Sequence, residues 1–298
     1  MSKITVFTPT YNRGNDECLG KCYRDLCAQT CKDFIWLIID DGSIDETENY
    51  VKPWLDKDNG FEIKYLKKMN GGTHTGYNKA FDLCNTELIF CLETDDEIMP
   101  KAIEIILREA NGNLYNQSIG LMSTAYYIGK DQIIGSPLPN NVKMLSYLES
   151  HYRYKSYGDK FFVYKMSAIG NYRFPEYEGE KLCSTAAMLL TILGKYKVVN
   201  ERIYNKSYLE DGYTKNRVAI NFAKNPKGFA YFHQVKLEKI YDIKTSIKSA
   251  IHYIGCSLLS NQGNIVRRSP RCLLTIVLFP LGYVWYLYLK KLNSSISK

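Results

Sequence analysis

The chain has 298 residues, of which 45% are hydrophobic, so a sizeable core can be buried in one large domain or one domain with an appendage. The nine cysteines follow no disulfide framework, and residues 1–4 lead straight into a strand without a signal peptide. These features argue for a reducing environment, and we expect a cytoplasmic location. The formal net charge of +8 favours anionic partners, either phosphates or an acidic membrane surface, and we expect no nucleic acid partner.

Short apolar runs alternate with helical segments over the first 110 residues. We predict strands over residues 4–8, 34–39, 62–66 and 87–92, with Pro9 ending the first strand. Helices are predicted over residues 15–30, 45–55, 73–84 and 101–110. This alternation requires parallel strands joined by right-handed crossovers, so the fold class is α/β with a mostly parallel sheet flanked by helices.

Polar residues follow three of these strands at the point where each strand ends. They are residues 8–11 (Thr-Pro-Thr-Tyr), Asp40 with Asp41, and Asp95 with Asp96. Because ligands of open parallel sheets bind at the carboxyl ends of the strands, we expect these segments to meet in one crevice.

The stretch Glu93-Thr94-Asp95-Asp96-Glu97 places four carboxylates within five positions. Such charges repel one another unless a cation is present, and their oxygens suit Mg²⁺ or Mn²⁺. The alternative is a solvated acidic loop before a helix. No GxGxxG or Walker motif follows the first strand, so a bound diphosphate needs another source of positive charge, and a metal on Asp96 would supply it.

Four motifs in order give a family resemblance over residues 3–110. Residues 4–13, ITVFTPTYNR, resemble the opening motif of family 2 glycosyltransferases, which have the GT-A fold. The turn at residues 40–43 is similar to their Asp-Asp-Gly-Ser turn, and residues 94–96 with Met99-Pro100 are similar to their metal-binding DxD-type motif. Residues 70–72 and Asn78 fit the segment between them.

The resemblance implies a role for each matching residue. The donor-binding residues would be Thr8, Pro9 and Tyr11 around the base, Asp41 at the uracil ring, Asn78, and Asp95 at the ribose. Asp96 would hold Mn²⁺ or Mg²⁺. Glu180 resembles the family's acidic residue beside the acceptor, the catalytic base of inverting members, and residues 208–214 resemble a loop that closes near the acceptor.

The second half of the chain is less regular. We predict strands over residues 119–123, 125–128, 161–165 and 196–204, and a helix over 182–193. The expected domains are a glycosyltransferase domain over residues 1–220 and a helical region over 221–298. The first comprises a nucleotide-sugar half, 1–110, and an acceptor half, 111–220.

Residues 272–289 are 18 uncharged residues, flanked by the basic residues Arg267, Arg268, Arg271, Lys290 and Lys291. We interpret this segment, broken at Pro280 and Gly282, as an interfacial or re-entrant membrane anchor with both flanks on the cytoplasmic side. A buried pair of core helices is the alternative.

The sequence therefore predicts an inverting, metal-dependent glycosyltransferase on the inner face of the cell membrane. It would move a sugar from a nucleotide-sugar, UDP-linked by preference, to a hydroxyl of a glycan or lipid-linked acceptor in surface polysaccharide synthesis. A nucleotidyltransferase and a non-catalytic, membrane-associated nucleotide-sugar binding protein are the alternatives.

Overall fold

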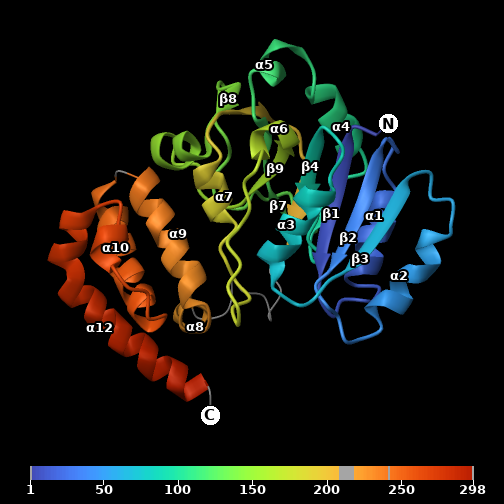
Figure 1. The fold of residues 1–298 in the computed structure, drawn as a ribbon. Coiled ribbons are helices and arrows are strands. Elements are labelled where there is room, and N and C mark those ends of the chain that lie inside the picture. Colours follow the sequence, from blue (N-terminus) through green and yellow to red (C-terminus); the bar gives the residue numbers. More distant parts are fainter. Residues whose placement is uncertain (1, 208–217, 241, 297–298) are drawn as a thin grey trace. The chain divides into compact units, whose positions relative to one another are not determined.

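The computed structural model describes residues 2–207, 218–240 and 242–296. Two compact units interleave along the sequence (Figure 1). Unit 1 comprises residues 1–70, 76–172 and 192–207, and unit 2 comprises residues 71–75, 173–191 and 208–298. The 208–214 segment, predicted to close near an acceptor, lies outside the described residues.

Unit 1 is built on an eight-stranded sheet with the order β3-β2-β1-β4-β9-β6-β10-β8. Its first four strands are parallel to one another, β10 is parallel to β6, and β9 runs antiparallel to both β4 and β6. The strands are β1 (Ile4–Thr10), β2 (Phe34–Asp40), β3 (Glu62–Lys67), β4 (Leu88–Cys91), β6 (Gly120–Thr124), β8 (Met144–Leu145), β9 (Lys160–Lys165) and β10 (Tyr196–Val199). The predicted mostly parallel α/β sheet is confirmed.

A second sheet of three short strands lies in unit 1, in the order β5 (Glu97–Ile98), β11 (Tyr204–Lys206) and β7 (Tyr126–Tyr127). The helices of this unit are α1 (Leu19–Cys27), α2 (Thr47–Leu55), α4 (Ala102–Glu109), α5 (Gly112–Asn116), α6 (Met166–Ile169), a π-helix over Glu149–Arg153, and most of α3 (Thr73–Leu83). The Asn15 side chain accepts the backbone N–H groups of Glu17 and Cys18, just before α1 begins.

The neighbouring strands β1 and β2 are buried along their whole length, as their continuous apolar runs predict. Fully buried aromatic side chains from three neighbouring strands, Phe7, Trp36 and Phe90, fill the core of unit 1. The indole N–H of Trp36 donates to Thr8 Oγ1 at 3.0 Å, which satisfies both buried polar groups.

The prediction that Pro9 ends the first strand is wrong, because β1 continues to Thr10. On the β4 side the pairing of β1 stops at Phe7, opposite Cys91. Successive backbone groups point to alternate sides of a strand, so Pro9 faces the side on which no ladder partner remains. A proline therefore removes no ladder hydrogen bond there.

Unit 2 is helical over its described residues. Its helices are α7 (Ala186–Thr191), α8 (Val218–Lys224), α9 (Pro226–Lys239), α10 (Ile243–Leu259), α11 (Ile265–Arg268) and α12 (Cys272–Ile296). Helix α10 lies beside both α9 and α12 (Figure 1). Apolar side chains of these helices form one core. Two predicted elements differ from the structure. The helix over 182–193 is shorter, and the strand over 196–204 is two strands, β10 and β11, in different sheets.

The predicted break in the C-terminal apolar segment is also wrong, because α12 runs through Pro280 without interruption. Gly282 is a packing residue: a Cβ there would lie 2.5 Å from Ile254 Cβ, so its absence lets α12 approach α10 closely. Gly255 on α10 allows the same close approach, because a Cβ at this position would lie 3.2 Å from the carbonyl oxygen of Gly282. Within the described chain, α12 is the helix with the length and composition of a membrane span.

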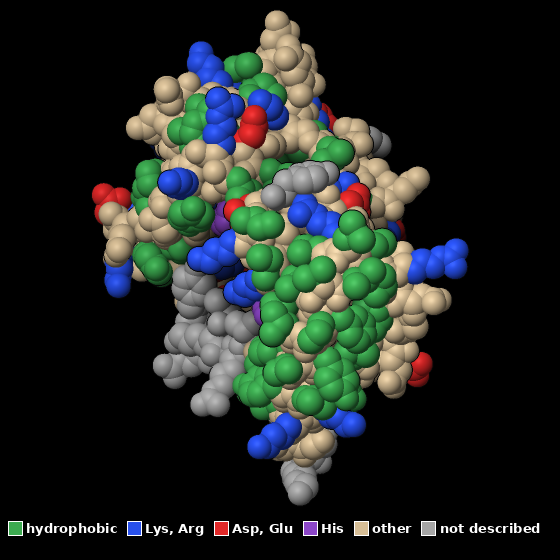
Figure 2. Space-filling view, turned by 90° about the vertical axis from the view of Figure 1, so that its left-hand side faces the viewer, with side chains coloured by type: hydrophobic (Ala, Val, Ile, Leu, Met, Phe, Trp, Pro, Cys, Tyr) green, Lys and Arg blue, Asp and Glu red, His purple; other side chains and the backbone are tan. Residues whose placement is uncertain are grey.

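Apolar residues cover the outer face of α12 as well as its packed face. The exposed ones recur at helical spacing, at Leu273, Ile276, Val277, Leu281, Val284, Leu287 and Tyr288. Figure 2 shows this band of hydrophobic side chains with Lys and Arg side chains at its border. The packed face, including Leu278, Trp285 and Leu289, belongs to the core of unit 2.

Candidate functional site

The carboxyl ends of β1, β2 and β3 lie side by side in unit 1, where Thr10 pairs with Asp40 and Asp40 with Lys67 (Figure 1). The loops after β1 and β2 are bonded to each other. Asn12 N–H donates to Ser43 Oγ at 2.8 Å, and Asn12 Oδ1 accepts the N–H of Ile44 at 2.9 Å. Two of the three segments predicted to meet, those that follow β1 and β2, are thus in contact.

The turn at residues 40–43 depends on a buried aspartate and a glycine. Asp40 is fully buried and accepts the Ser43 N–H at 2.7 Å and the Tyr65 hydroxyl. Gly42 has a φ of 77°, and a Cβ there would lie 2.9 Å from Asn70 N and from Lys68 O. Only glycine fits a positive φ with the neighbouring backbone this close.

Asp41, the residue predicted to meet the uracil ring, is nearly buried at 5% exposure. Its N–H donates to Thr10 O at 2.8 Å, which fixes the backbone against β1. Its carboxylate pairs with Lys68 Nζ and accepts from Asn70 Nδ2 at 3.3 Å. The sequence reading missed this lysine.

The other residues predicted to bind the donor lie in the same unit. Thr8 is fully buried and its hydroxyl accepts from Trp36, whereas Tyr11 is 44% exposed in the loop after β1. Asn78 is buried on α3. A Cβ at Gly76 of the same helix would lie 3.2 Å from Pro9 Cβ, so this glycine lets α3 pack closely on the end of β1.

Asp96 lies in the turn between β4 and β5, and its side chain is fully buried. Its Oδ1 accepts the N–H of Ser207 at 3.0 Å. Its Oδ2 accepts the Tyr204 hydroxyl and lies 3.3 Å from Lys206 Nζ. The main-chain oxygen of Asp96 accepts from Lys21 Nζ at 2.7 Å.

The charges in this turn act strongly on one another. Burial raises the pKa of Glu93 to about 7; Lys206 opposes this rise, and the carboxylates of Asp96 and Asp95 add to it. Burial likewise raises the pKa of Asp96, and Lys206 opposes it. Burial lowers the pKa of Lys206, but Asp96 and Glu93 outweigh it and hold that pKa above its ordinary value. Lys206 therefore stays charged and balances the carboxylates.

The fit of a divalent metal depends on Asp96. Among the described residues, no three His, Cys, Asp or Glu side chains gather closely enough to hold a metal. Mg²⁺ does not need such a cage, because it is commonly held by one or two carboxylates plus substrate phosphates. Asp96 is a carboxylate of this kind, although both of its oxygens already have protein partners. The residues fit a metal held jointly with a diphosphate, provided that Asp96 releases a present partner.

Glu180, the predicted base, lies in unit 2 and is 9% exposed. Its two oxygens accept the N–H groups of Lys227 and Gly228, both at 2.8 Å, at the first turn of α9. Burial raises the pKa of this carboxyl, and the two N–H groups oppose the rise. Negative charge at a helix N-terminus is stabilising, so Glu180 also holds its own loop on α9.

Two neighbouring contacts fix the segment around Glu180 within unit 2. Asn225 Oδ1 accepts the N–H groups of Lys181 and Leu182 at 2.8 and 3.0 Å. His74 accepts the N–H of Cys183 through Nδ1 at 3.3 Å. These hydrogen bonds hold the backbone of residues 181–183 in place.

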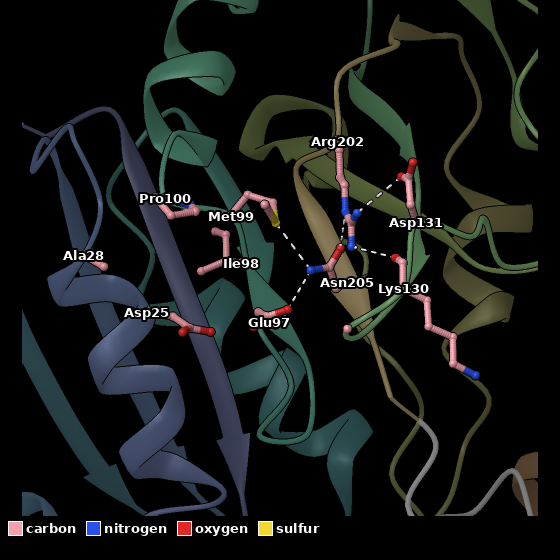
Figure 3. A pocket seen from close by; sticks show the side chains of 11 residues that line it. Asp25, Ala28, Glu97, Ile98, Met99, Pro100, Lys130, Asp131, Arg202 and Asn205 are labelled. Carbon is pink, nitrogen blue, oxygen red and sulfur yellow. Dashed lines mark hydrogen bonds and ion pairs between the residues drawn. The ribbon is translucent and has the colours of Figure 1, made fainter.

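A separate pocket of about 470 Å³ lies in unit 1 beside the three-stranded sheet (Figure 3). Glu97 faces it and accepts from Asn205 Nδ2 at 2.6 Å, while Arg202 donates to Asn205 and to the carbonyl of Lys130. The acidic stretch thus divides: Asp96 faces Lys206, and Glu97 faces this pocket.

Three residues that contact Asp41 or Asp96 were not predicted from the sequence: Lys68, Tyr204 and Lys206. The two from β11 follow Asp96 by more than 100 residues and carry no motif. Only Lys68 had a usable signal, because it directly follows a strand parallel to β2.

A mostly parallel sheet with acidic turns at the carboxyl ends of its strands defines the class as a GT-A-type α/β protein, as predicted. The profile of the family described as "Glycosyl transferase family 2" matches residues 5–169, more than half of the chain. The chain belongs to this family.

Two curated relatives show the level of similarity. The Campylobacter jejuni GalNAc(5)-diNAcBac-PP-undecaprenol beta-1,3-glucosyltransferase is 29% identical over 185 residues, which cover 59% of this chain and 56% of that protein. The Staphylococcus aureus poly(ribitol-phosphate) beta-N-acetylglucosaminyltransferase TarP is 33% identical over 124 residues, covering 40% and 36%. The matches thus span about half or less of these relatives.

Among solved structures, S. aureus TarS 1-349 has a TM-score of 0.62 at 15% identity, covering 99% of this chain and 91% of that one. The same protein in complex with UDP-GlcNAc has a TM-score of 0.60 at 15% identity, with the same coverage. The mannosyltransferase PcManGT from Pyrobaculum calidifontis, in complex with GDP-Man and Mn²⁺, gives 0.51 at 14%, covering 96% and 87%. At these identities the likeness shows the fold.

Proposed function

We propose that this protein is an inverting glycosyltransferase that moves a sugar from a UDP-sugar to a hydroxyl of a glycan or lipid-linked acceptor. The observation that carries the proposal is the family match over residues 5–169, because that range contains all three loops at the carboxyl ends of the parallel strands. The relatives' names add support: one acts on an undecaprenol-linked glycan, another on poly(ribitol-phosphate), and TarS was solved with UDP-GlcNAc.

The uridine would be recognised by the loops after β1 and β2. Tyr11 is exposed in the first loop, where its ring can stack on a base, and Pro9 and Thr8 lie at the adjoining end of β1. Asp41 would accept the ring N–H of uracil, which cytosine lacks at its unprotonated N3. Asn78 and Asp95 complete the proposed donor-binding set, with Asp95 at the ribose hydroxyls.

Asp96 would hold Mn²⁺ or Mg²⁺ together with the donor's diphosphate. When bound, such a metal is a Lewis acid that offsets the charge developing on the leaving UDP. The acidic composition of residues 93–97 and the PcManGT complex with Mn²⁺ support this assignment.

Glu180 would accept the proton of the acceptor hydroxyl. The oxygen then forms a bond to the anomeric carbon while the bond from that carbon to the UDP oxygen breaks, and UDP leaves with the electron pair. A single displacement of this kind inverts the anomeric centre. Each Glu180 oxygen accepts one N–H and retains a second lone pair. Burial raises the pKa of the Glu180 carboxyl, which makes the carboxylate a stronger base.

The outer face of α12 would lie on the cytoplasmic surface of the membrane. Its exposed apolar residues can enter the boundary between headgroups and acyl chains, as in-plane amphipathic helices do. The basic residues Arg267, Arg268, Lys290 and Lys291 flank it, and each cation near an anionic bilayer adds roughly 1 kcal/mol. Because its other face packs on α10, we favour an in-plane helix over a span.

Calorimetry with UDP tests the donor assignment. The unmodified protein should bind UDP more tightly in the presence of Mn²⁺, and Asp96→Ala should lose that gain while keeping its far-UV circular dichroism spectrum. An unchanged metal effect in the folded variant would contradict the assignment of Asp96.

A further inference from the structure

Lys206 pairs with the carboxylate to which the proposed function assigns a metal ion. Its ammonium nitrogen lies 3.3 Å from Asp96 Oδ2, and Asp96 is fully buried. Tyr204 and the Ser207 N–H hold the same carboxylate, so β11 and the residue after it surround Asp96 with hydrogen-bond donors. In this state the carboxylate is satisfied without a metal.

The two cations cannot share this carboxylate. A divalent ion on Asp96 would stand close to the ammonium group, and like charges a few ångströms apart in a buried site repel strongly. One of them must leave. Lys206 can do so, because a lysine ammonium sits on a flexible four-carbon stem and this side chain is 28% exposed.

We propose that Lys206 is the resident counter-ion of Asp96, and that a divalent metal binds only by displacing it. This inference rests on the proposed function for the identity of the metal site. Its consequence is an order of events: the free protein binds metal weakly, and metal enters together with a diphosphate. Once displaced, the Lys206 ammonium would pair with the phosphate oxygens, as lysines commonly do.

The contacts of the other residues around the acidic turn support the role of Lys206 as the counter-ion. Glu93 and Asp96 both interact with Lys206, whereas Lys21 is engaged by the main-chain oxygen of Asp96 and pairs with Asp25 at 3.4 Å. Loss of Lys206 would leave the carboxylates of Glu93 and Asp96 without this cation. The turn would then attract a free divalent ion.

The test is direct Mn²⁺ binding, by calorimetry and by electron paramagnetic resonance of free Mn²⁺, without nucleotide. Lys206→Met should bind Mn²⁺ about tenfold more tightly or better, since removing one close positive charge is worth at least that factor. Lys206→Arg keeps the charge and should match the unmodified protein. Lys197→Met is the control: it removes one lysine of unit 1, paired with Glu109 at 2.9 Å, and should change nothing.

Lys206→Gln covers the case in which the methionine variant fails to fold, because an amide N–H can still donate to Asp96. It should show the same gain in Mn²⁺ affinity, and UDP should raise that affinity less than it does in the unmodified protein. Mn²⁺ affinity that is unchanged or weaker in a folded Lys206→Gln protein would overturn the exchange. The measurement needs neither donor sugar nor acceptor. A negative result would therefore refute the exchange of Lys206 for metal without refuting the proposed sugar transfer. Likewise, an enzyme that transfers no sugar would not refute the exchange.

Discussion

Replacing Glu93 by glutamine should stabilise the protein at alkaline pH and leave its stability unchanged at acid pH. Glu93 is partly buried, and it accepts from Cys91 Sγ at 3.4 Å and from the Tyr77 hydroxyl at 3.5 Å. A glutamine has nearly the same shape, and its carbonyl oxygen can accept from both. The substitution therefore removes the charge and retains the contacts.

The magnitude follows from the pKa of Glu93, which burial raises from 4.5 to about 7. The folded protein holds the proton to higher pH than the unfolded chain, so stability falls as pH rises from 4.5 to 7 and stays lower above 7. The difference between these pKa values corresponds to roughly 3 kcal/mol. Because Glu93 keeps some solvent contact, we expect a gain of roughly 2–3 kcal/mol for Glu93→Gln at pH 8.

Urea unfolding of both proteins at pH 4, 6 and 8 in the presence of a chelator measures this gain. Tryptophan fluorescence reports on unit 1 through the buried Trp36. Glu17→Gln, at an exposed carboxylate of the same unit, is the control and should give a profile parallel to that of the unmodified protein. If the free energies of unfolding of Glu93→Gln and of the unmodified protein differed by the same amount at pH 4, 6 and 8, the charge balance described for the acidic turn would be refuted.

Three further substitutions test other parts of the account. Asp41→Ala should weaken UDP binding by about 1–3 kcal/mol in calorimetry, the cost of losing a charged hydrogen bond, and equal binding of UDP and CDP to the unmodified protein would contradict the assignment. Glu180→Gln should bind donor normally but transfer sugar roughly 10²–10⁴-fold more slowly, and near-normal turnover would move the base to Glu178 or Asp211. Gly282→Val should destabilise unit 2 by roughly 1–3 kcal/mol in thermal unfolding, because its side chain would clash with Ile254, whereas Leu281→Val on the exposed face should have little effect.

The sheet and its loops could be predicted because they depend on local patterns. Continuous apolar runs at β1 and β2 identify buried parallel strands, and parallel topology alone brings the turn at Asp40 beside the loop at Asn12. The end of the first strand was predicted wrongly at Pro9, because a proline disrupts a strand only where a neighbouring strand would pair with it. Where the neighbouring strand stops cannot be read from the residues around Pro9.

Contacts between distant segments were beyond the reach of the sequence. Lys206 contacts Asp96 only because β11 pairs with β5, and no local sequence pattern predicts that pairing. Glu180 could be chosen from its resemblance to a family position, but its two hydrogen bonds to the start of α9 could not. Gly282 looks like a helix breaker in isolation, and becomes a packing residue once α10 lies against it.

Nucleotide release from a panel of nucleotide-sugars tests the central claim most directly. The full chain is incubated with UDP-, GDP- and CDP-sugars and with lipid-linked or glycan acceptors, with and without Mn²⁺, and the released nucleotide is measured. We predict acceptor-dependent release of UDP that requires Mn²⁺ and is lost in Asp96→Ala. Release of GDP or CDP in place of UDP, or UDP release that is the same with and without acceptor, would contradict the account.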